Sequence, residues 1–436
     1  MFKKSLLLLL LIPFAFSCSD PFEDANNANI VDTDKGQDNI FDYVNSIMHD
    51  EYLWSELSPS VSNPQRYSTP EALLEALRYR NDRFSFISEE FNSSNARISA
   101  ENNFEIEVGS GLIIIATPNY DAFYIMNATE GTPAYDAGVR RGDQVLTING
   151  NPIDRQNYGI LYSQTQGTPI QLTVKRGTQD LNFSFNIARI NADFVGPVTV
   201  FDDGQGHKTG YINFESFKTV AEEPLKAAFR RFEAEGVNNL ILDLRFNGGG
   251  LVSLSAKLAA MIYPQATSSD VFLKQTYNDK YANENRNTLF NPQNINNNFQ
   301  KVAIIQDAYT ASASETIIFC LRPYLGNKLL SFGTESVGKD VGSVLFNKFG
   351  YNFFPIVFRI TNKNNEGDYA QGLAPDIEIG ESVFNLQNFP LGTRNEAKIS
   401  AALNWIENGQ VSNLRTKASE QLILGKYPYT TNLIDQ

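Results

Sequence analysis

Two short apolar runs in the second half of the chain constrain the possible folds most strongly. The runs NNLILDLRFN (238–247) and KVAIIQDA (301–308) have uninterrupted apolar centres, which is typical of strands buried on both faces. Other strand-like and helix-like patterns alternate around them, at 210–217, 220–235, 251–263, 317–325 and 328–333. Strands that alternate with helices form parallel sheets with right-handed crossovers. We therefore expect an α/β core with a mainly parallel sheet.

The first 37 residues have the pattern of an export signal followed by a tether. Two lysines precede an apolar segment that is too short to cross a bilayer as a helix. We predict a signal peptide at 1–17 and, because the next stretch is acidic and rich in Asn, a flexible tether at 18–37. The letters AFSC resemble a bacterial lipobox, which predicts that Cys18 is lipidated and becomes the mature N-terminus. Plain cleavage near Ser17 is the alternative.

Composition limits the partners and the environment of the chain. The formal net charge of −13 makes nucleic acid and anionic surfaces poor partners. Cys18 and Cys320 are the only cysteines, so no internal disulfide is expected, and Cys320 is predicted to be a small buried side chain. We expect a lipoprotein attached to the outer membrane of a Gram-negative-type cell envelope through Cys18, facing the periplasm or the cell surface. The sequence leaves the oligomeric state open.

After the tether, the type of secondary structure that the sequence predicts changes several times. Apolar residues at helical spacing and a Ser-Thr-Pro-Glu start signal predict helices, and the motif DRFSFIS (82–88) closes this block. The Asn-rich stretch 277–300 is predicted to be a long mobile surface loop. The predicted parts are a helical domain at 38–103, short strands at 104–191, the α/β core at 192–392 and a C-terminal helical segment at 393–436.

The stretch GTPAYDAGVRRGDQVLTINGNPI (131–153) is the most specific short pattern in the chain. Its Asn149-Gly150 pair predicts a type I′ hairpin turn, and the full pattern resembles a PDZ domain. PDZ domains bind peptide C-termini as an added strand, and backbone N–H groups capture the carboxylate. The resemblance implies that a helix at 157–166 lines the groove. The implied peptide-binding residues are Gly109, Ser110, Gly111, Leu112 and Ile113.

The stretch TASASE contains three hydroxyl side chains spaced two residues apart, Thr310, Ser312 and Ser314. Ser312 and Glu315 also fit the S-x-x-E capping box, which satisfies backbone donors at the start of a helix. From this stretch alone, a nucleophile and an ordinary helix start both stay open.

Few candidate bases for a serine nucleophile exist in this chain. His49 and His207 are the only histidines and lie in no catalytic motif, so a Ser-His-Asp triad is weakly supported and both are expected to face solvent or to cap a helix or turn. No H-E-x-x-H pattern or Cys/His cluster is present, so no metal site and no cofactor are expected. A lysine can act as the base when burial lowers its pKa. Lys339 in GTESVGKD is the candidate, although alone it is an ordinary loop lysine.

The stretch DLRFNGGG (243–250) ends a predicted buried strand. Its three glycines could expose backbone N–H groups at the edge of the sheet, where α/β sites usually form. A phosphate cradle is the alternative, but neither G-K-[ST] nor G-x-G-x-x-G is present.

The order of these motifs resembles the C-terminal processing peptidases, also called tail-specific proteases. The resemblance implies a multidomain α+β and α/β fold with an N-terminal helical bundle, a PDZ β-domain and an α/β peptidase core. It implies Ser312 as the nucleophile, with Thr310 in place of the first serine of the family motif, and Lys339 as the base. Gly248 stands at the family's proline position, and Ser343 stands where the family often has a Gln that orients the lysine.

The implied mechanism is acyl transfer to serine. Neutral Lys339 takes the proton from Ser312 Oγ, and Ser312 attacks a peptide carbonyl to form an acyl-enzyme. The implied oxyanion donors are the backbone N–H groups of Gly249 or Gly250 and of Ala313. The expected partners are polypeptides that are unstructured or have free C-termini.

Two other functions stay open on the sequence. A catalytically inactive peptide-binding scaffold of the same fold is permitted by Thr310 and Ser343, although both Ser312 and Lys339 are present. The other is an unrelated esterase that uses Ser312, although this chain lacks the G-x-S-x-G motif of such enzymes.

Overall fold

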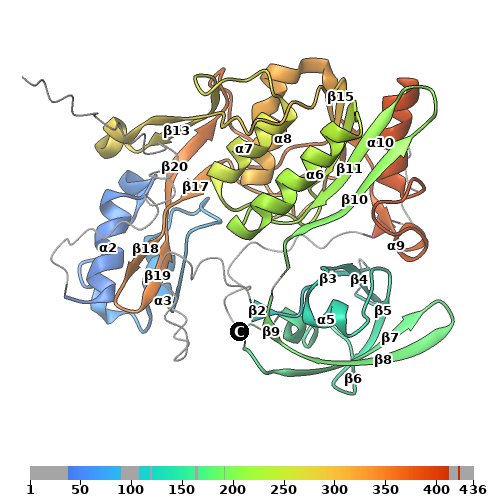
Figure 1. Ribbon diagram of the computed structural model, residues 1–436. Coiled ribbons are helices and arrows are strands. Elements are labelled where there is room, and N and C mark those ends of the chain that lie inside the picture. The colour runs from blue at the N-terminus through green and yellow to red at the C-terminus, as the bar shows by residue number, and fades with distance from the viewer. Residues whose placement is uncertain are drawn as a thin grey trace, which may run out of the picture.

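The computed structural model describes residues 38–89, 108–117, 120–162, 165–190 and 192–411, and the backbone of 421–422. The predicted signal peptide, the tether and Cys18 lie outside these residues. Figure 1 shows an N-terminal unit in blue, a domain of short strands in teal, and a large core coloured from green to red. No helix within the described residues has the length and apolar character needed to cross a membrane.

The core is built on a six-stranded sheet with the order β10-β11-β12-β15-β16-β21. Its strands are β10 Val195–Asp202, β11 Lys208–Phe214, β12 Asn239–Asp243, β15 Lys301–Gln306, β16 Leu329–Gly333 and β21 Ile377–Glu378. Neighbouring strands from β11 to β21 are parallel, with Leu240 opposite both Gly210 and Val302, whereas β10 is antiparallel to β11. The prediction of a mainly parallel sheet is confirmed.

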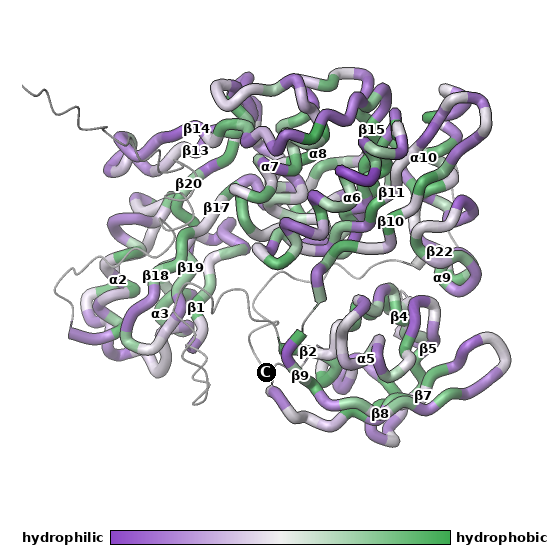
Figure 2. The backbone as a smooth tube through the Cα atoms, viewed as in Figure 1, coloured by the Kyte–Doolittle hydropathy of each residue, from purple (hydrophilic) through white to green (hydrophobic). Residues whose placement is uncertain are grey.

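Helices cover both faces of this sheet. They are η4 Thr219–Ala221, α6 Glu222–Ala234, α7 Val252–Ile262, α8 Ala313–Leu325, η6 Gly326–Lys328 and α10 Ala397–Asn408. Successive side chains of a strand point to opposite faces: Leu240 and Leu242 join the apolar cluster with α6, α7 and α8, whereas Ile241 joins the cluster with α10. Figure 2 shows the apolar residues gathered along β11, β15 and α8. Burial on both faces explains the uninterrupted apolar runs.

A second sheet with the order β14-β13-β20-β17 packs beside α7 and α8. Its elements are β13 Val271–Tyr277, η5 Asp279–Glu284, β14 Arg286–Leu289, β17 Val341–Ser343 and β20 Ile356–Thr361. The prediction of a long loop at 277–300 is wrong, because η5 and β14 lie there and β14 pairs with β13. Phe290, Ile295 and Phe299 of this stretch are buried in the main apolar cluster.

The N-terminal unit joins helices to strands from a distant part of the chain. Its elements are α2 Ile40–Asp50, η1 Ser55–Leu57, η2 Pro64–Arg66, α3 Pro70–Leu77, β1 Phe86–Glu89, β18 Phe346–Lys348 and β19 Tyr351–Phe354. α3 begins after Thr69, whose hydroxyl oxygen accepts the N–H of Ala72 and satisfies one donor of the first turn. The end of DRFSFIS forms β1, which pairs antiparallel with β19 so that Phe86 lies opposite Phe354.

Residues 108–190 form a domain of short strands, here called the PDZ-like domain. Its elements are β2 Val108–Gly109, β3 Leu112–Ala116, β4 Phe123–Ala128, α5 Pro133–Asp136, β5 Gln144–Ile148, β6 Asn151–Pro152, η3 Tyr158–Tyr162, β7 Pro169–Arg176, β8 Gln179–Asn186 and β9 Ala188–Arg189. Asn149 and Gly150 have φ values of 51° and 80°, as the predicted type I′ turn requires. The helix expected at 157–166 is a 3₁₀ helix at Tyr158–Tyr162, and residues 163–164 lie outside the described chain.

The remaining elements lie near the C-terminal end, at β22 Glu381–Ser382, α9 Val383–Asn388 and β23 Gln421–Leu422. Figure 1 shows α9 between the core and the PDZ-like domain. A Cβ atom at Gly142 would lie 2.6 Å from the carbonyl oxygen of Leu386. The PDZ-like domain therefore packs directly against α9.

Candidate active site

Ser312 lies immediately before α8, where the chain turns into the helix after β15. Its backbone has φ 55° and ψ −118°, a combination that costs about 1–3 kcal/mol for residues other than glycine and that clusters at functional sites. The neighbouring Gly249 makes room for Ser312, because a Cβ atom at Gly249 would lie 2.8 Å from Ser312 Cβ. The surrounding structure therefore holds Ser312 in a strained conformation.

The carboxylate of Glu315 connects the two parts of the predicted site. It is fully buried and accepts the N–H groups of Ser312 (2.8 Å), Gly338 (2.6 Å) and Lys339 (2.8 Å) and the hydroxyl of Ser336 (2.5 Å). Burial raises the pKa of Glu315, while these donors act in the opposite direction. The carboxylate thus ties the start of α8 to the loop that carries Lys339.

Lys339 lies in the loop between β16 and β17, and its side chain is partly buried. Its Nζ lies 5.5 Å from the centroid of the Phe84 ring, and across the described chain it makes no hydrogen bond to Ser312 Oγ. Burial lowers the pKa of Lys339, and the charges of Asp82 and Glu315 oppose this shift. The backbones of the two predicted catalytic residues therefore bind one carboxylate, while no hydrogen bond joins their side chains in the described structure.

Arg83 of the N-terminal unit contacts the lysine loop. Its Nη2 donates to the carbonyl oxygens of Val337 (3.0 Å), Gly338 (3.1 Å) and Ala370 (2.7 Å). Sequence reasoning missed this contact, because DRFSFIS was interpreted only as the end of the helical block. The motif itself was the available signal, but no local pattern links it to a loop 254 positions later.

The glycines of DLRFNGGG follow β12 and lie against the start of α8. Asn247 Oδ1 accepts the N–H of Gly249 at 2.9 Å, and Asn247 O accepts the hydroxyl of Ser314 at 2.9 Å. The N–H of Gly249, a predicted oxyanion donor, is thus bonded to a side chain. The N–H groups of Gly250 and Ala313, the other predicted donors, make no hydrogen bond with any described residue.

The three hydroxyl residues of TASASE have different surroundings. Thr310 Oγ1 donates to the carbonyl oxygen of Leu244 at 2.9 Å, and Thr310 and Ser314 are fully buried. Ser312 is the partly exposed member of the three. Thr310 and Ser314 therefore brace the loops around Ser312.

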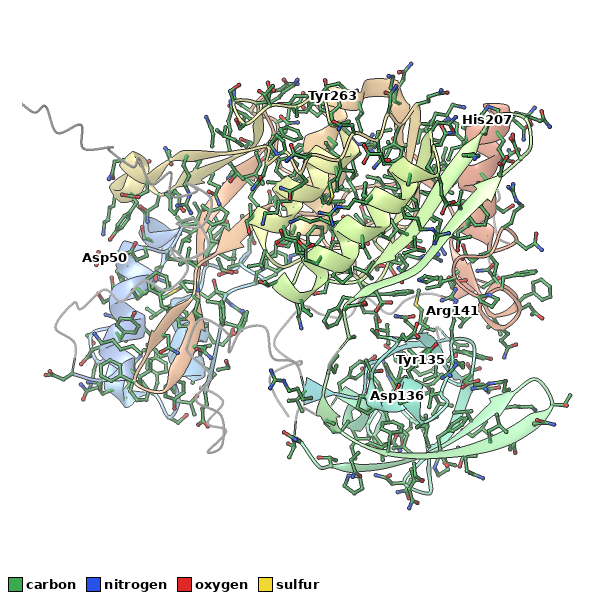
Figure 3. The ribbon with its side chains drawn as sticks, in the orientation of Figure 1. Asp50, Tyr135, Asp136, Arg141, His207 and Tyr263 are labelled. Carbon is green, nitrogen blue, oxygen red and sulfur yellow. The ribbon has the colours of Figure 1, made fainter. Side chains whose placement is uncertain are left out.

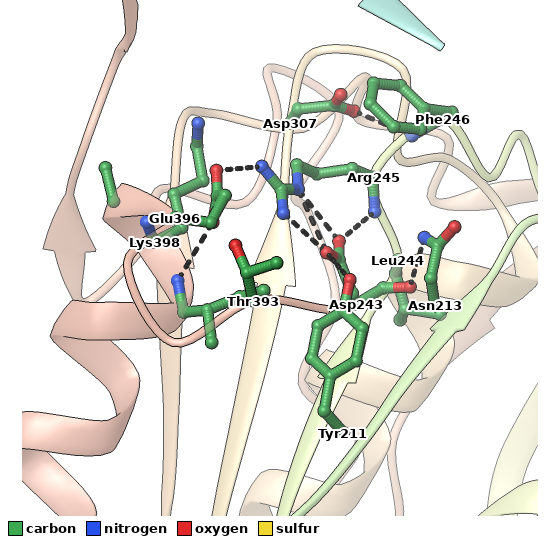
Figure 4. A network of polar contacts seen from close by, with 12 residues as sticks. Tyr211, Asn213, Asp243, Leu244, Arg245, Phe246, Asp307, Thr393, Glu396 and Lys398 are labelled. Atoms are coloured by element: carbon green, nitrogen blue, oxygen red, sulfur yellow. Dashed lines mark hydrogen bonds and ion pairs between the residues drawn. The ribbon is translucent and has the colours of Figure 1, made fainter. Parts of the chain in front are cut away.

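A buried ionic network lies at the start of DLRFNGGG (Figure 4). Arg245 is fully buried and pairs with Asp243 at 2.6 Å and with Glu396 at 2.8 Å, while Lys398 pairs with Glu381 at 3.2 Å. Burial alone would raise the pKa of Glu396, but Arg245 and Lys398 lower it to about 2. The network fixes the strand that leads into the glycines relative to α10.

Arg141 extends this network to the PDZ-like domain, and Figure 3 shows it on the side of that domain that faces the core. It donates to the carbonyl oxygen of Met126 at 2.6 Å and to Glu381 at 3.1 Å. A small apolar cluster adds to the contact, with members Ile115, Tyr124, Met126, Phe246 and Leu386. The PDZ-like domain is therefore packed against the residue that precedes the NGGG turn.

The predicted peptide-binding residues lie together at the beginning of β3. Ser110 Oγ donates to the carbonyl oxygen of Leu161 at 2.6 Å and accepts the N–H of Leu112 at 3.3 Å. The hydroxyl of Tyr162 accepts the N–H of Ile114 at 3.0 Å. The 3₁₀ helix of the same domain thus covers the strand edge to which a peptide would add.

The other predicted residues of this loop have structural contacts. Gly109 ends β2 and pairs with Ala188, and Ile113 pairs with Asn127. Gly111 has φ 78°, and a Cβ atom there would overlap the side chain of Thr132. Position 111 is therefore restricted to glycine by both conformation and packing.

Neither histidine is part of this arrangement. His207 Nδ1 lies 2.6 Å from Asp203 Oδ2 near the β10–β11 turn, and His49 Nδ1 lies 2.8 Å from the carbonyl oxygen of Asn45. Figure 3 shows His207 at the end of the core that is remote from the PDZ-like domain. The described residues include no group of three His, Cys, Asp or Glu side chains that could hold a metal ion. Cys320 is buried in α8, as predicted.

Three family models match consecutive segments of the chain. They are the peptidase S41 N-terminal domain at 39–86, the PDZ domain at 111–187 and peptidase family S41 at 208–379. The predicted PDZ domain and the order of domains along the chain are thereby matched by independent family models.

Curated relatives match most of the length of the chain. The chain is 25% identical over 317 residues to the carboxyl-terminal-processing protease of Picosynechococcus sp.. The aligned residues cover 71% of this chain and 73% of the relative. It is 21% identical over 376 residues to the carboxyl-terminal-processing protease of Synechocystis sp., with 84% of each chain covered.

Solved protease structures also resemble this chain. An S41 protease from Bacteroides fragilis is 26% identical, with a TM-score of 0.69 and coverage of 84% of this chain and 97% of that chain. The photosystem II D1 C-terminal processing protease is 18% identical, with a TM-score of 0.50 and coverage of 78% and 92%. The second similarity concerns the fold alone.

Proposed function

The chain belongs to peptidase family S41, and from this premise we propose that it is an exported, lipid-anchored serine endopeptidase of the tail-specific type. Its substrates are polypeptides that are unstructured or end in free C-termini, and the PDZ domain binds them. The observation that carries the proposal is the shared carboxylate, because Glu315 holds the backbone of Ser312 beside the backbone of Lys339.

Lys339 is the general base in this proposal. Its lowered pKa increases the neutral fraction of the amine, so Nζ takes the proton from Ser312 Oγ as Oγ bonds to the peptide carbonyl carbon. The peptide C–N bond then breaks, and the leaving amine takes the proton from Lys339. Water hydrolyses the acyl ester, with Lys339 again accepting the proton, and Ser312 is restored. The flexible four-carbon stem of the lysine brings Nζ from the Phe84 ring to Ser312.

The backbone N–H groups of Gly250 and Ala313 are the oxyanion donors in this proposal. Both are without an acceptor among the described residues, and Ala313 is the first residue of α8. A helix N-terminus adds positive partial charge where the oxyanion forms. Gly249 contributes only when its N–H leaves Asn247 Oδ1.

Two substitutions test the dyad. Ser312→Ala and Lys339→Ala should each abolish the hydrolysis of an unstructured polypeptide, while circular dichroism and the thermal unfolding temperature stay close to the wild type. Retention of full activity by either variant would contradict the dyad.

A second candidate, a peptide-binding protein without catalysis, is favoured by one observation. Among the described residues, Ser312 Oγ and Lys339 Nζ form no hydrogen bond. This candidate predicts that the wild-type protein binds polypeptides with free C-termini but leaves them intact. Incubation of wild type and Ser312→Ala with polypeptides of varied C-terminal sequence separates the two candidates.

The lipid anchor is proposed from the lipobox-like sequence. Cys18→Ser should move the protein from the membrane fraction to the soluble fraction, and mass spectrometry of the wild-type N-terminus should find a lipid-modified cysteine. An unmodified N-terminus near Ser17 would contradict the anchor. Protease treatment of intact cells distinguishes the cell surface from the periplasm.

A further inference from the structure

The contact between the N-terminal unit and the lysine loop involves more than Arg83. The Arg83 guanidinium lies 4.7 Å from the centroid of the Phe84 ring, and Lys339 Nζ lies 5.5 Å from the same centroid. Phe84 also packs against the main apolar cluster of the protein. A side chain of the N-terminal unit therefore forms one wall around the predicted base.

Asp82 fixes the position of this wall. Its Oδ1 accepts the N–H groups of Phe84 at 2.8 Å and Ser85 at 3.0 Å, and its Oδ2 accepts the hydroxyl of Tyr52 at 2.8 Å. Asp82 is itself buried. One oxygen of Asp82 thus holds the backbone at Phe84 and Ser85, and the other is held by Tyr52.

The N-terminal unit is firmly attached to the core on which Lys339 lies. The N–H of Leu53 donates to the carbonyl oxygen of Ile356 at 2.8 Å, and the N–H of Ile356 donates to Ser85 Oγ at 2.9 Å. The antiparallel pairing of β1 with β19 continues the same junction. Phe84 is therefore a fixed part of the site.

Several charges surround Lys339. Asp82 and Glu315 face it and favour its protonated form, Asp340 follows it in the chain and is buried, and Arg83 brings a positive charge to the loop. With more carboxylates than cations nearby, a neutral amine requires that water be kept out. Phe84 is an apolar side chain beside this amine, with its ring centroid 5.5 Å from Nζ.

We propose that Phe84 is a positioning residue for the lysine base: its ring excludes water from the Lys339 amine, and Arg83 clamps the loop that carries this amine against the ring. The inference rests on the proposed Ser312/Lys339 dyad and adds that the N-terminal unit supplies part of the catalytic environment. The face of an aromatic ring also attracts an ammonium, so the test must separate exclusion of water from this attraction.

The pH dependence of kcat/KM provides the test, because its acid limb reports the pKa of the base in the free enzyme. Phe84→Ala admits water and should move the acid limb upward by about one pH unit, which is about a tenfold loss near neutral pH that recovers in alkaline solution. Phe84→Leu keeps an apolar wall without an aromatic face, and it should keep the wild-type profile. An equal loss at every pH, or a downward shift of the limb, in Phe84→Ala would overturn the inference.

Arg83→Met tests the clamp and also covers the case in which Phe84→Ala does not fold. It removes two hydrogen bonds to the lysine loop and one to Ala370, and it should lower kcat at least tenfold with little change in KM. Arg80→Met is the matched control, since Arg80 is exposed on the same unit, and it should retain wild-type kinetics. Equal kinetics of the Arg83 and Arg80 variants would overturn the clamp.

Failure of this inference can be distinguished from failure of the proposed function. If Ser312→Ala retains full hydrolysis, the dyad is wrong and the role of Phe84 falls with it. If Ser312→Ala and Lys339→Ala are inactive while the acid limb of Phe84→Ala does not move, the dyad stands and the inference alone is overturned.

Discussion

Ser312 and Lys339 donate their backbone N–H groups to one atom, Oε2 of Glu315, each at 2.8 Å. The other oxygen of the same carboxylate accepts the hydroxyl of Ser336 and the N–H of Gly338. A change at Glu315 should therefore move the predicted nucleophile relative to the predicted base without altering the chemistry of either side chain.

Glu315→Gln should weaken both the fold and the activity. The amide keeps one oxygen but replaces the other with an N–H₂ group, which cannot accept the donors that Glu315 now binds. Each buried donor left without an acceptor costs about 1–3 kcal/mol of unfolding free energy. Displacing the two residues by about 1 Å should lower kcat/KM by about 100-fold. Urea unfolding and peptide hydrolysis measure the two effects.

The control for this variant is Glu378→Gln, on an exposed position of β21 in the same core. It removes the same charge without a buried donor and should leave the unfolding free energy within about 0.5 kcal/mol of the wild type. Indistinguishable behaviour of the two variants would contradict the role given to Glu315.

Gly249→Ala should disrupt the start of α8. The residue has φ 101°, and its Cβ would lie 2.8 Å from both Ala311 O and Ser312 Cβ, so either the glycine loop or Ser312 must move. We expect a loss of kcat/KM of about 100-fold or more. Gly177→Ala is the matched control, because Gly177 also has positive φ, at 60°, with no atom within 4 Å of the added Cβ. It should cost about 1 kcal/mol in stability and leave kcat/KM unchanged. Equal activities in the two variants would be incompatible with the contact.

Acid should weaken the protein through Glu396. The pKa of this carboxyl is lowered from 4.5 to about 2 in the fold, so its ionised form stabilises the folded state at pH values above 4.5. This contribution is lost as the pH falls from 4.5 towards 2. We expect the free energy of unfolding, measured by urea at a series of pH values, to fall across this window.

Glu396→Gln provides the comparison for the acid effect. Its unfolding free energy should depend less steeply on pH below 4.5. At pH 7 the variant should be less stable by about 3–5 kcal/mol, because it leaves the buried Arg245 with one partner fewer. A slope identical to that of the wild type would show that another carboxylate controls the acid transition.

Tyr162→Phe should strengthen the binding of C-terminal peptides. The tyrosine hydroxyl accepts the N–H of Ile114, a group on the edge of β3 that a peptide strand would otherwise use. Removing this competitor, worth about 0.5–1.5 kcal/mol, should lower the Kd of a labelled peptide by up to about tenfold. Tyr135→Phe on α5 is the control in the same domain and should not change the Kd. Weaker binding by Tyr162→Phe would contradict the idea that the hydroxyl competes with the peptide.

The parts of the fold that depend on local periodicity could be predicted from the sequence. The runs around Leu240 and Ile304 are apolar at every central position because each strand is buried on both faces, and this pattern is visible without tertiary information. The stretch 277–300 misled the prediction, since Phe290, Ile295 and Phe299 are separated by asparagines and form no regular period. Their burial depends on the surface against which they pack.

In the candidate site, only the residues that belong to local sequence motifs could be predicted. The S-x-x-E pattern predicted a cap, and Glu315 does accept the N–H of Ser312. The pattern could not predict the positive φ of Ser312 or the closeness of Gly249, which follows another strand. The contacts of Arg83 and of the Arg245–Glu396 pair join residues far apart in the chain. Such pairs depend on how distant segments of the chain pack together, and a single sequence contains no periodic signal for that packing.

The pairing of Phe86 with Phe354 has a consequence for the order of events during synthesis. The N-terminal unit is translated first, but its sheet needs a partner strand that is made only after most of the core. Contacts of such long sequence separation form slowly and late in folding. The surroundings of Lys339 are therefore completed near the end of folding, so a growing chain lacks the finished environment of the predicted base. A peptidase assembled in this order would lack its complete site for as long as its own segments are still unfolded.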